Sequence, residues 1–440
     1  MLSGFVRAFK TPDLRKKLLF TLFVIAIYRL GTAVPTPGVN YTKVNACVSS
    51  ADPTSGFIGL ANLFSGGALL QLSIFALGIM PYITASIIVQ LLTVVIPRFE
   101  ALKKEGQAGQ TKLTQYTRYL TIGLAVLQSS TLITFARNPR QIFGATCTSI
   151  MDDQSAMTIV IMVLTLTAGT GLIMWLGELL TDRGIGNGMS VLIFTSIASG
   201  FPGSLWQIQQ RDNRWDVFFG IILMGFVIMA AVIFVEQSQR RVPVQYAKRQ
   251  VGRRMYGGSS TYIPLKVNMA GVIPVIFASS LLSLPSLIAQ FNTPQNGQPP
   301  AGWVTWISTN MTRGDHPIYM AIYTALILFF TFFYVSITFN PVEVSDNMKK
   351  YGGFIPGIRA GRPTAEYLDY VLTRITVPGA LYLAVISLIP LLALKAFGGN
   401  AAQSFPFGGT SILIIVGVGL ETVKQIQAQL QQRNYEGFLR

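Results

Sequence analysis

Long apolar blocks separated by polar stretches are the dominant pattern of this chain. Nine of the ten blocks are 17 to 24 residues long, and the fifth has 14. A helix needs about 20 apolar residues to cross the hydrocarbon layer of a bilayer. We therefore predict a membrane-spanning helix in each block, the short fifth one being the least secure. The blocks cover residues 18–34, 73–96, 116–136, 157–177, 188–201, 217–235, 267–290, 318–339, 371–394 and 410–426.

A half-length apolar segment precedes the second block. Residues 57–64 are mostly apolar, and Ser65-Gly66-Gly67 interrupts the chain before the block begins at Ser73. Eight residues cannot cross a bilayer as a helix. Two interpretations stay open: a helix folded back inside protein or a water-filled cavity, or an amphipathic helix lying on the outer membrane surface.

Composition agrees with the pattern of blocks. Of the 440 residues, 51% are hydrophobic and 12% are charged, and the mean hydropathy is +0.49. This much apolar surface in repeated blocks is typical of a multi-pass membrane protein. The first block follows Arg15-Lys16-Lys17 and resembles a secretory signal. Because nine further spans need no cleaved leader, we interpret it as an uncleaved first helix.

The distribution of charge predicts the orientation. With the N-terminus inside, the inner segments hold 26 of the 34 Lys and Arg residues, the outer loops hold seven, and Arg29 lies within a span. The inner segments hold 12 of the 18 acids, so their net charge is +14, against +1 outside. Cytoplasmic loops of membrane proteins carry such an excess of cations. Ten spans then place both termini in the cytoplasm.

Two inner loops are long enough to be more than connectors. Residues 237–266 contain seven cations and no acid. They predict either a solvated loop that fixes topology or a docking surface for a polyanionic partner, such as ribosomal RNA or an acidic protein face. Part of the inner charge would attract anionic lipid. Residues 340–370 have mixed charge with several Gly and Pro, which favours a shaped protrusion.

The residues offer little material for catalysis, metal binding or ion coupling. His316 is the one histidine, and the two cysteines, Cys47 and Cys147, have no ligand-like companions nearby in sequence. We predict no catalytic, cofactor-binding or metal-binding residues. Charges other than Arg29 lie toward the ends of the blocks, so a buried ion relay is poorly supported. Both cysteines fall in predicted outer loops, where a disulfide and two free thiols are both compatible with the sequence.

Eight motifs, in order and across nearly the whole chain, resemble those of the SecY family of protein-conducting channels. They are LFSGGAL, SIFALGIMPYITASIIVQLLTVV, QYTRY, MWLGELLTDRGIGNGMS, YAKRQVGRR, PLKVNMAGVIPVIFASS, FNPVEVSDNMKKYGGFIPGIR and FGGTSILI. The resemblance implies an all-α integral membrane fold with ten transmembrane helices in two pseudo-symmetric halves of five and a short re-entrant plug helix.

This architecture divides the chain into five parts. A cytoplasmic segment (1–17) precedes the N-terminal half (18–201), which includes the plug at about 56–70. An outer connecting loop (202–216) leads to the C-terminal half (217–427) and a cytoplasmic tail (428–440).

The resemblance also implies roles for single residues. A movable plug would close the pore, and Ser65-Gly66-Gly67 supply the conformational freedom that such a stopper needs. Met189 departs from the isoleucine usual in the pore ring, and its flexible thioether would make a softer seal. The plug residues are Phe57, Leu60, Leu63, Phe64, Ser65, Gly66 and Gly67, and the aliphatic pore ring consists of Ile79, Ile83, Met189, Ile193, Ile276 and Ile414.

Polar residues complete the picture that the family implies. Thr84, Gln128 and Asn268 would form a lateral gate between the second, third and seventh helices, held by weak polar contacts. Arg253, Arg254 and Arg359 would dock cytoplasmic partners. The family's partners are the small subunits SecE and SecG, the motor ATPase SecA, the ribosome, signal sequences and nascent chains, and anionic lipid, in a bacterial plasma membrane.

The predicted function is passive passage of unfolded secretory polypeptides, with lateral release of transmembrane segments into lipid. A narrow apolar ring excludes water and ions by dewetting and offers a sliding chain few polar contacts. The main alternative is a secondary transporter for a small solute, a class that also uses broken helices and repeated halves. A lipid scramblase or insertase without a pore, or an intramembrane protease, fits the plug segment and the missing catalytic groups less well.

Overall fold

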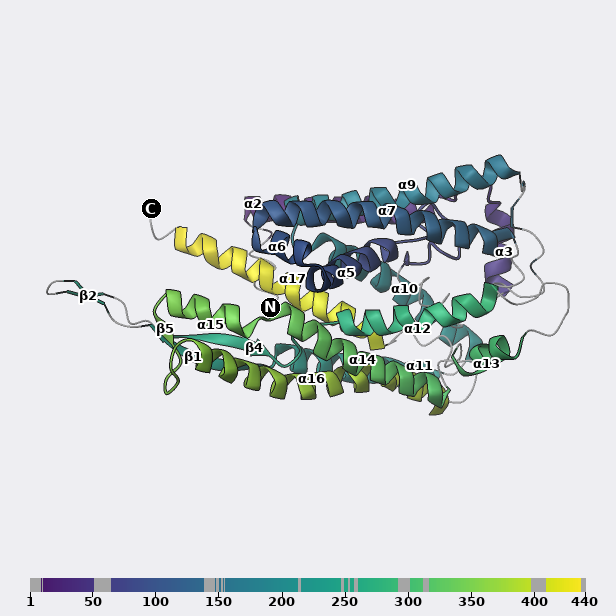
Figure 1. The fold of residues 1–440 in the computed structure, drawn as a ribbon. Coiled ribbons are helices and arrows are strands. Elements are labelled where there is room, and N and C mark those ends of the chain that lie inside the picture. Colours follow the sequence, from purple (N-terminus) through teal and green to yellow (C-terminus); the bar gives the residue numbers. More distant parts are fainter. Residues whose placement is uncertain are drawn as a thin grey trace. The chain divides into compact units, whose positions relative to one another are not determined.

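Two compact units make up the chain in the computed structural model (Figure 1). Unit 1 comprises Met1–Asn213 and Val418–Arg440, and unit 2 comprises Arg214–Gly417. The division at residue 213 lies inside the predicted connecting loop, but the last 23 residues belong with unit 1. The structure describes residues 9, 11–50, 65–137, 147, 150–151, 153, 155–212, 215–246, 249–251, 254–256, 260–291, 301–311, 316–396 and 409–436.

Unit 1 is built from helices. Its long helices are apolar on most faces, as expected for segments surrounded by lipid and other helices. Helix α17 starts in unit 2 and ends in unit 1. The helices are α2 (Pro12–Ala33), α3 (Tyr41–Ser50), α5 (Met80–Val95), α6 (Pro97–Lys104), α7 (Gln107–Arg137), α9 (Ala156–Arg183), α10 (Gly188–Asp212) and α17 (Gly409–Glu436).

The second apolar block is the largest departure from the predicted spans. Helix α5 begins only at Met80, and residues 66–79 form hydrogen-bonded turns instead of the first helical turns we predict from Ser73. Gly66, Gly67 and Gly78 have positive φ, as does Leu72 (47°). A right-handed helix cannot continue through such residues.

The helix also ends abruptly. Ile96 is extended because a following proline disfavours the helical conformation. The axis of α6 consequently turns by 100° from that of α5.

Other boundaries differ less. Helix α10 runs to Asp212, so most of the predicted outer loop 202–216 is helical and the helix extends well beyond the short fifth apolar block. The seventh block becomes helical only at Ile273, six residues later than predicted.

Unit 2 combines helices with a three-stranded sheet and a separate two-stranded hairpin. Its helices are α11 (Trp215–Gln237), α12 (Ile273–Phe291), α13 (Gly302–Asn310), α14 (Pro317–Thr338), α15 (Pro341–Lys350) and α16 (Arg362–Ala396). Its strands are β1 (Gln239–Tyr246), β2 (Arg249–Val251), β3 (Arg254–Tyr256), β4 (Ser260–Lys266) and β5 (Gly353–Phe354). The all-α prediction omitted this sheet.

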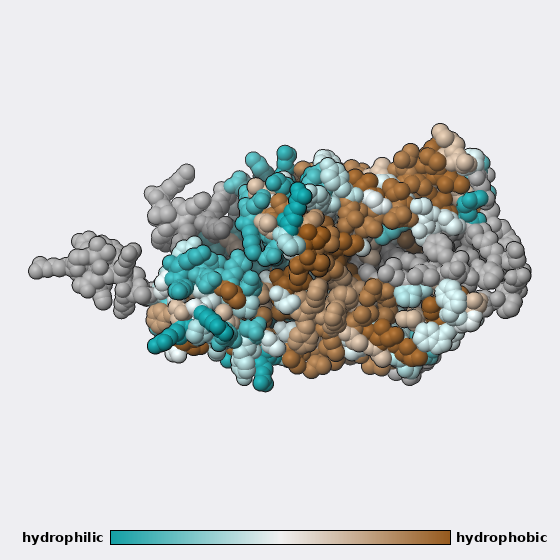
Figure 2. Space-filling view, viewed as in Figure 1, coloured by the Kyte–Doolittle hydropathy of each residue, from teal (hydrophilic) through white to brown (hydrophobic). Residues whose placement is uncertain are grey.

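The three-stranded sheet joins the two long loops, residues 237–266 and 340–370. β1 pairs antiparallel with β4 over seven residues and with β5 through Gln245 and Tyr246, giving the order β4-β1-β5. Val242 and Val244 are buried and alternate with exposed residues, the pattern of a strand with one face on a core. Figure 2 shows hydrophilic residues gathered over α15 and hydrophobic residues along the helices of this unit.

The helical membrane fold predicted from the sequence is confirmed, but the number of spans is not. Among the described residues, four helices are long and apolar enough to cross a membrane, or five if the bent pair α5 and α6 counts as one span. α10 and α11 contain shorter apolar stretches. The count of ten therefore stays a prediction.

Candidate functional sites

The C-terminal part of the predicted plug segment, residues 65–67, is held between α2 and α10 of unit 1. The Arg29 Nη1 donates a hydrogen bond to the Gly66 carbonyl oxygen at 3.2 Å. Ser65 is buried, and its hydroxyl accepts a hydrogen bond from the Leu69 amide at 3.0 Å. Of the predicted plug residues, Phe57, Leu60, Leu63 and Phe64 lie outside the described residues, whereas Ser65, Gly66 and Gly67 lie inside them.

The residues of the predicted aliphatic ring are mostly buried. Ile79 caps the N-terminus of α5, and its carbonyl accepts a hydrogen bond from the Ile83 amide at 3.1 Å. Ile83 is half-buried. Met189 packs against Gly177 of α9, where a Cβ would collide with the thioether. The other buried members are Ile193 on α10, Ile276 on α12 and Ile414 on α17. Four members belong to unit 1 and two to unit 2, so their convergence on one ring stays a prediction.

The three predicted gate residues have different surroundings. Thr84 is half-buried and its hydroxyl donates to the Met80 carbonyl oxygen of its own helix, while Gln128 is half-buried on α7. The sequence placed Asn268 within the seventh apolar block. In the structure it lies before α12, which begins at Ile273. Its Nδ2 donates to Glu236 Oε1 at 2.6 Å and to the Gly271 carbonyl oxygen at 3.2 Å. These contacts hold Asn268 just before the N-terminus of α12, and its role in a gate stays a prediction.

Two of the three predicted docking residues, Arg254 and Arg359, lie in described parts of unit 2. Arg254 is the first residue of β3 and pairs with Val251 of β2 in a small hairpin. Arg359 is exposed, and its carbonyl oxygen accepts a hydrogen bond from Thr364 Oγ1 at 2.7 Å. Arg253 lies outside the described residues. The three-stranded sheet therefore connects loop 237–266 with loop 340–370 through the pairing of β1 and β5.

A packed core supports these protruding loops. Val242, Val244 and Leu265 from β1 and β4 contact Met348 of α15 and Ile355 after β5. The Arg241 guanidinium lies over the Tyr262 ring, 4.8 Å from its centre, which adds a cation–π contact across the strand pair. Strands β1 and β4, at the two ends of the basic loop 237–266, are thus packed on a core.

Comparison with known proteins assigns the chain to a family over nearly its whole length. The SecY family model matches residues 73–423. Proteins named "Protein translocase subunit SecY" from Streptomyces griseus, Micrococcus luteus and Mycobacterium tuberculosis are 66%, 58% and 56% identical, each with 100% of both chains covered. The chain belongs to the SecY family.

Solved structures show the same fold at much lower identity. The structure described as "The structure of a protein conducting channel" has a TM-score of 0.60 and 17% identity, and covers 94% of this chain and 92% of its own. Sec61 in a canine ribosome-channel complex has a TM-score of 0.60 and 16% identity with the same coverage.

One charged pair of this SecY family member was missed by reasoning from sequence. Arg118 on α7 binds Glu178 on α9 through two hydrogen bonds, Nε to Oε1 at 2.9 Å and Nη2 to Oε2 at 2.7 Å. Arg118 Nη1 also donates to Gln115 Oε1 at 3.1 Å. From the sequence, Glu178 is one of the charges toward the ends of the blocks, and we predicted no partner for it. The signal was available, because antiparallel neighbours place the start of the third block beside the end of the fourth.

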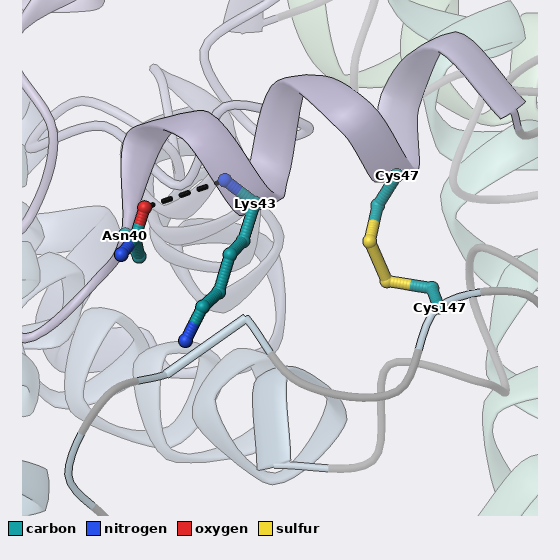
Figure 3. Close-up of a disulfide and its surroundings, with 4 residues drawn as sticks. All are labelled: Asn40, Lys43, Cys47 and Cys147. Atoms are coloured by element: carbon teal, nitrogen blue, oxygen red, sulfur yellow. Dashed lines mark hydrogen bonds between the residues drawn. A yellow bond between two sulfur atoms is a disulfide. The ribbon is translucent and has the colours of Figure 1, made fainter.

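The two cysteines of this SecY family member form a disulfide (Figure 3). Cys47 of α3 and Cys147 have Cα atoms 5.5 Å apart. Both are buried in an apolar cluster with Val44, Ile150 and Met162. The Asn40 side chain accepts a hydrogen bond from the Lys43 amide at 3.3 Å at the start of α3. The disulfide interpretation is the one that the structure supports.

Acidic and sulfur ligands do not cluster in the part of the chain that the structure describes. No group of three or more His, Cys, Asp and Glu side chains there could hold a metal ion.

Proposed function

We propose that this chain is the pore-forming subunit of a protein translocation channel, which passes unfolded secretory polypeptides across a membrane and releases transmembrane segments sideways into lipid. The observation that carries the proposal is 66% identity to a protein translocase SecY subunit over the full length of both chains. The relatives and solved structures above are translocation channels or their subunits by name, so the small-solute transporter has no support from them.

The proposed path runs through the aliphatic ring. Ile79, Ile83, Met189, Ile193, Ile276 and Ile414 would form a narrow apolar constriction. Such a ring resists water and ions while a chain of varied sequence slides through it. The plug segment would close the outer side in the resting channel, and Thr84, Gln128 and Asn268 would line the lateral exit.

The cytoplasmic sheet of unit 2 would receive the partner that supplies the chain. Arg254 belongs to the β2–β3 hairpin of the basic loop 237–266. Arg359 is exposed in the segment between β5 and α16. We assign this surface, with Arg253, to a ribosome or SecA. One of the solved relatives with this fold is a ribosome-channel complex. SecE and SecG would complete the channel.

The proposed location is a bacterial plasma membrane with both termini in the cytoplasm. The uneven distribution of Lys and Arg supports this orientation. The chain would supply no catalysis of its own, so a partner has to provide the directional work. Anionic lipid would bind at the same cationic inner side.

The deciding experiment is photocross-linking from position 83 to a stalled secretory chain in native membranes. The matched control places the same cross-linker at Leu164, which is 63% exposed on α9 of the same unit. We expect signal-dependent cross-links from position 83 and none from 164. A second control uses a substrate with a defective signal sequence. Equal labelling from both positions, or labelling that ignores the signal sequence, would mean that Ile83 does not line the path.

A further inference from the structure

Arg29, a cation near the end of α2 (the predicted first span), contacts the C-terminal part of the predicted plug segment. Arg29 lies one turn before the end of α2, and its guanidinium donates a hydrogen bond to the carbonyl oxygen of Gly66 at 3.2 Å. Charged groups inside membrane spans are costly and usually functional. Neither the ring, the gate nor the docking surface uses Arg29.

Helices α2 and α10 shape the surroundings of this contact. The Tyr28 hydroxyl forms a hydrogen bond with Ser196 Oγ at 2.6 Å, which ties α2 to α10. The Tyr28 ring also stacks on Phe75, with ring centres 5.8 Å apart. Tyr28, Phe75 and Ser196 are all at most 2% exposed. These buried contacts hold this part of α2, and with it the backbone of Arg29, in place.

The slot that receives the turn fits only a glycine. Gly66 has a φ of +66°, and a Cβ at this position would lie 3.0 Å from Arg29 Nη1 and 3.2 Å from the Cα of Ser196. Other residues adopt this backbone conformation at a cost. The next residue, Gly67, has a φ of +92° and open space around it. The backbone is thus closely surrounded by Arg29 and Ser196 at Gly66, whereas Gly67 has room to change its conformation.

We propose that Arg29 is a positioning residue that latches the downstream end of the plug segment in the resting channel. The inference rests on the proposed function, because it requires the predicted plug segment, at about residues 56–70, to close the pore. A hydrogen bond from a charged donor to a carbonyl is stronger than a neutral one and needs no covalent change to release. Once the turn leaves, water in the opened channel can solvate the guanidinium. The latch would set how readily a signal sequence opens the channel.

The test measures ion leak through the resting channel, purified with its partner subunits and reconstituted into vesicles. We expect Arg29→Gln to raise the leak about tenfold, the change in population that loss of one charge-assisted hydrogen bond produces. The same variant should export a substrate with a defective signal sequence. Arg137→Gln is the matched control, because Arg137 is an exposed arginine in the last turn of α7 of the same unit. It should leave both readouts unchanged.

A second variant approaches the contact from the other side. Gly66→Ala keeps the carbonyl but forces the turn out of its slot, so it should also raise the leak. Arg29→Lys keeps the charge without the planar fork and should have an intermediate effect. Thermal unfolding of each variant separates a folded, leaking channel from a misfolded one. A folded Arg29→Gln channel with the leak of the parent overturns the latch.

A deletion of residues 57–64 distinguishes failure of the latch from failure of the plug assignment. If the deletion leaks and Arg29→Gln adds nothing to it, Arg29 acts through the plug as proposed. If the two effects add, Arg29 acts on helix packing and the latch is overturned. If the deletion itself does not leak, residues 57–64 are not a plug, and the latch falls with that assignment.

Discussion

At the scale of single residues, the ion pair between Arg118 and Glu178 is the strongest polar contact between α7 and α9 among those described. Its two parallel hydrogen bonds give the fork geometry that arginine forms with carboxylates. The side chains are 42% and 21% exposed, and beside lipid an unpaired charge would be costly. The pair therefore fixes how these two helices sit side by side.

Glu178→Gln should destabilise the protein by about 1–2 kcal/mol, because Arg118 would lose a charged acceptor. Thermal unfolding in detergent should show a midpoint a few degrees lower. The exchanged pair, Arg118→Glu with Glu178→Arg, should recover part of the loss. An unchanged midpoint for Glu178→Gln would show that the pair contributes nothing to stability.

Glu100→Gln provides a matched control for this substitution. Glu100 accepts a hydrogen bond from Lys104 Nζ at 2.7 Å within α6, and this bond lowers the pKa of the Glu100 carboxyl. The pair is local to one helix and exposed to water. Pairs of this kind contribute little to stability. The melting midpoint of Glu100→Gln should match that of the parent protein.

At the scale of elements, the sequence predicts what apolar blocks can specify and misses what backbone conformation decides. The blocks locate the long helices, because burying apolar side chains in lipid depends only on composition and length. Residues 66–79 are equally apolar, yet positive φ at Leu72 and three glycines keeps them in turns. The strands β1 and β4 escaped notice because charged residues hide the alternation of Val242 and Val244.

The turn segment packs on α9 through a glycine, which gives an element-scale prediction. A Cβ at Gly169 would collide with the backbone oxygen of Ile74, whereas a Cβ at Gly171 meets nothing within 4 Å. Gly169→Ala should cost about 1–3 kcal/mol through overpacking. Gly171→Ala should be neutral or add up to about 1 kcal/mol through helix propensity. Thermal unfolding compares the two, and equal midpoints would show that α9 and the turn are not in close contact.

The three-stranded sheet of unit 2 should fold or fail as one element. Val244 is 1% exposed in the core under the sheet, and the next residue, Gln245, is exposed. Val244→Asp would bury an unpaired carboxylate, at a cost of several kcal/mol. Strands β1 and β4 should then separate from the core. Gln245→Asp puts the same side chain on the outer face and should be tolerated. Rapid tryptic cleavage of residues 237–266 in the first variant only would support this, and equal resistance would contradict it.

At the scale of the whole molecule, the sites depend on relationships that no single block encodes. The ring requires side chains from α5, α10, α12 and α17 to meet, and these come from both units. Apolar periodicity cannot distinguish a pore-lining isoleucine from one that faces another helix. The family resemblance supplied that assignment, whereas contacts such as Arg29 with Gly66 required coordinates.

The disulfide tests both the stability and the orientation of the whole molecule. It closes a loop with a sequence separation of 100 residues, and backbone hydrogen bonds join the same region, from Asn40 N to the Ile150 oxygen and from Thr36 N to the Leu72 oxygen. Cys47→Ser with Cys147→Ser should therefore lower the free energy of unfolding, by up to about 4.7 kcal/mol in the chain-entropy account, and with it the melting midpoint.

Disulfides persist on the oxidising side of a bacterial membrane and are rare in the cytosol. Mass spectrometry of protein alkylated in intact cells, with and without prior reduction, should show no free thiol until a reductant is added. In a control with Cys47→Ser alone, Cys147 should be a free thiol that reacts with a thiol reagent. Because this side chain is only 1% exposed, the reagent is applied after mild opening of the packed cluster. Two free thiols in untreated cells would contradict the bond and remove this support for an outer location of α3. A bonded pair would instead place α3 and Cys147 outside, and the basic sheet of unit 2 would then lie inside if the spans alternate as predicted.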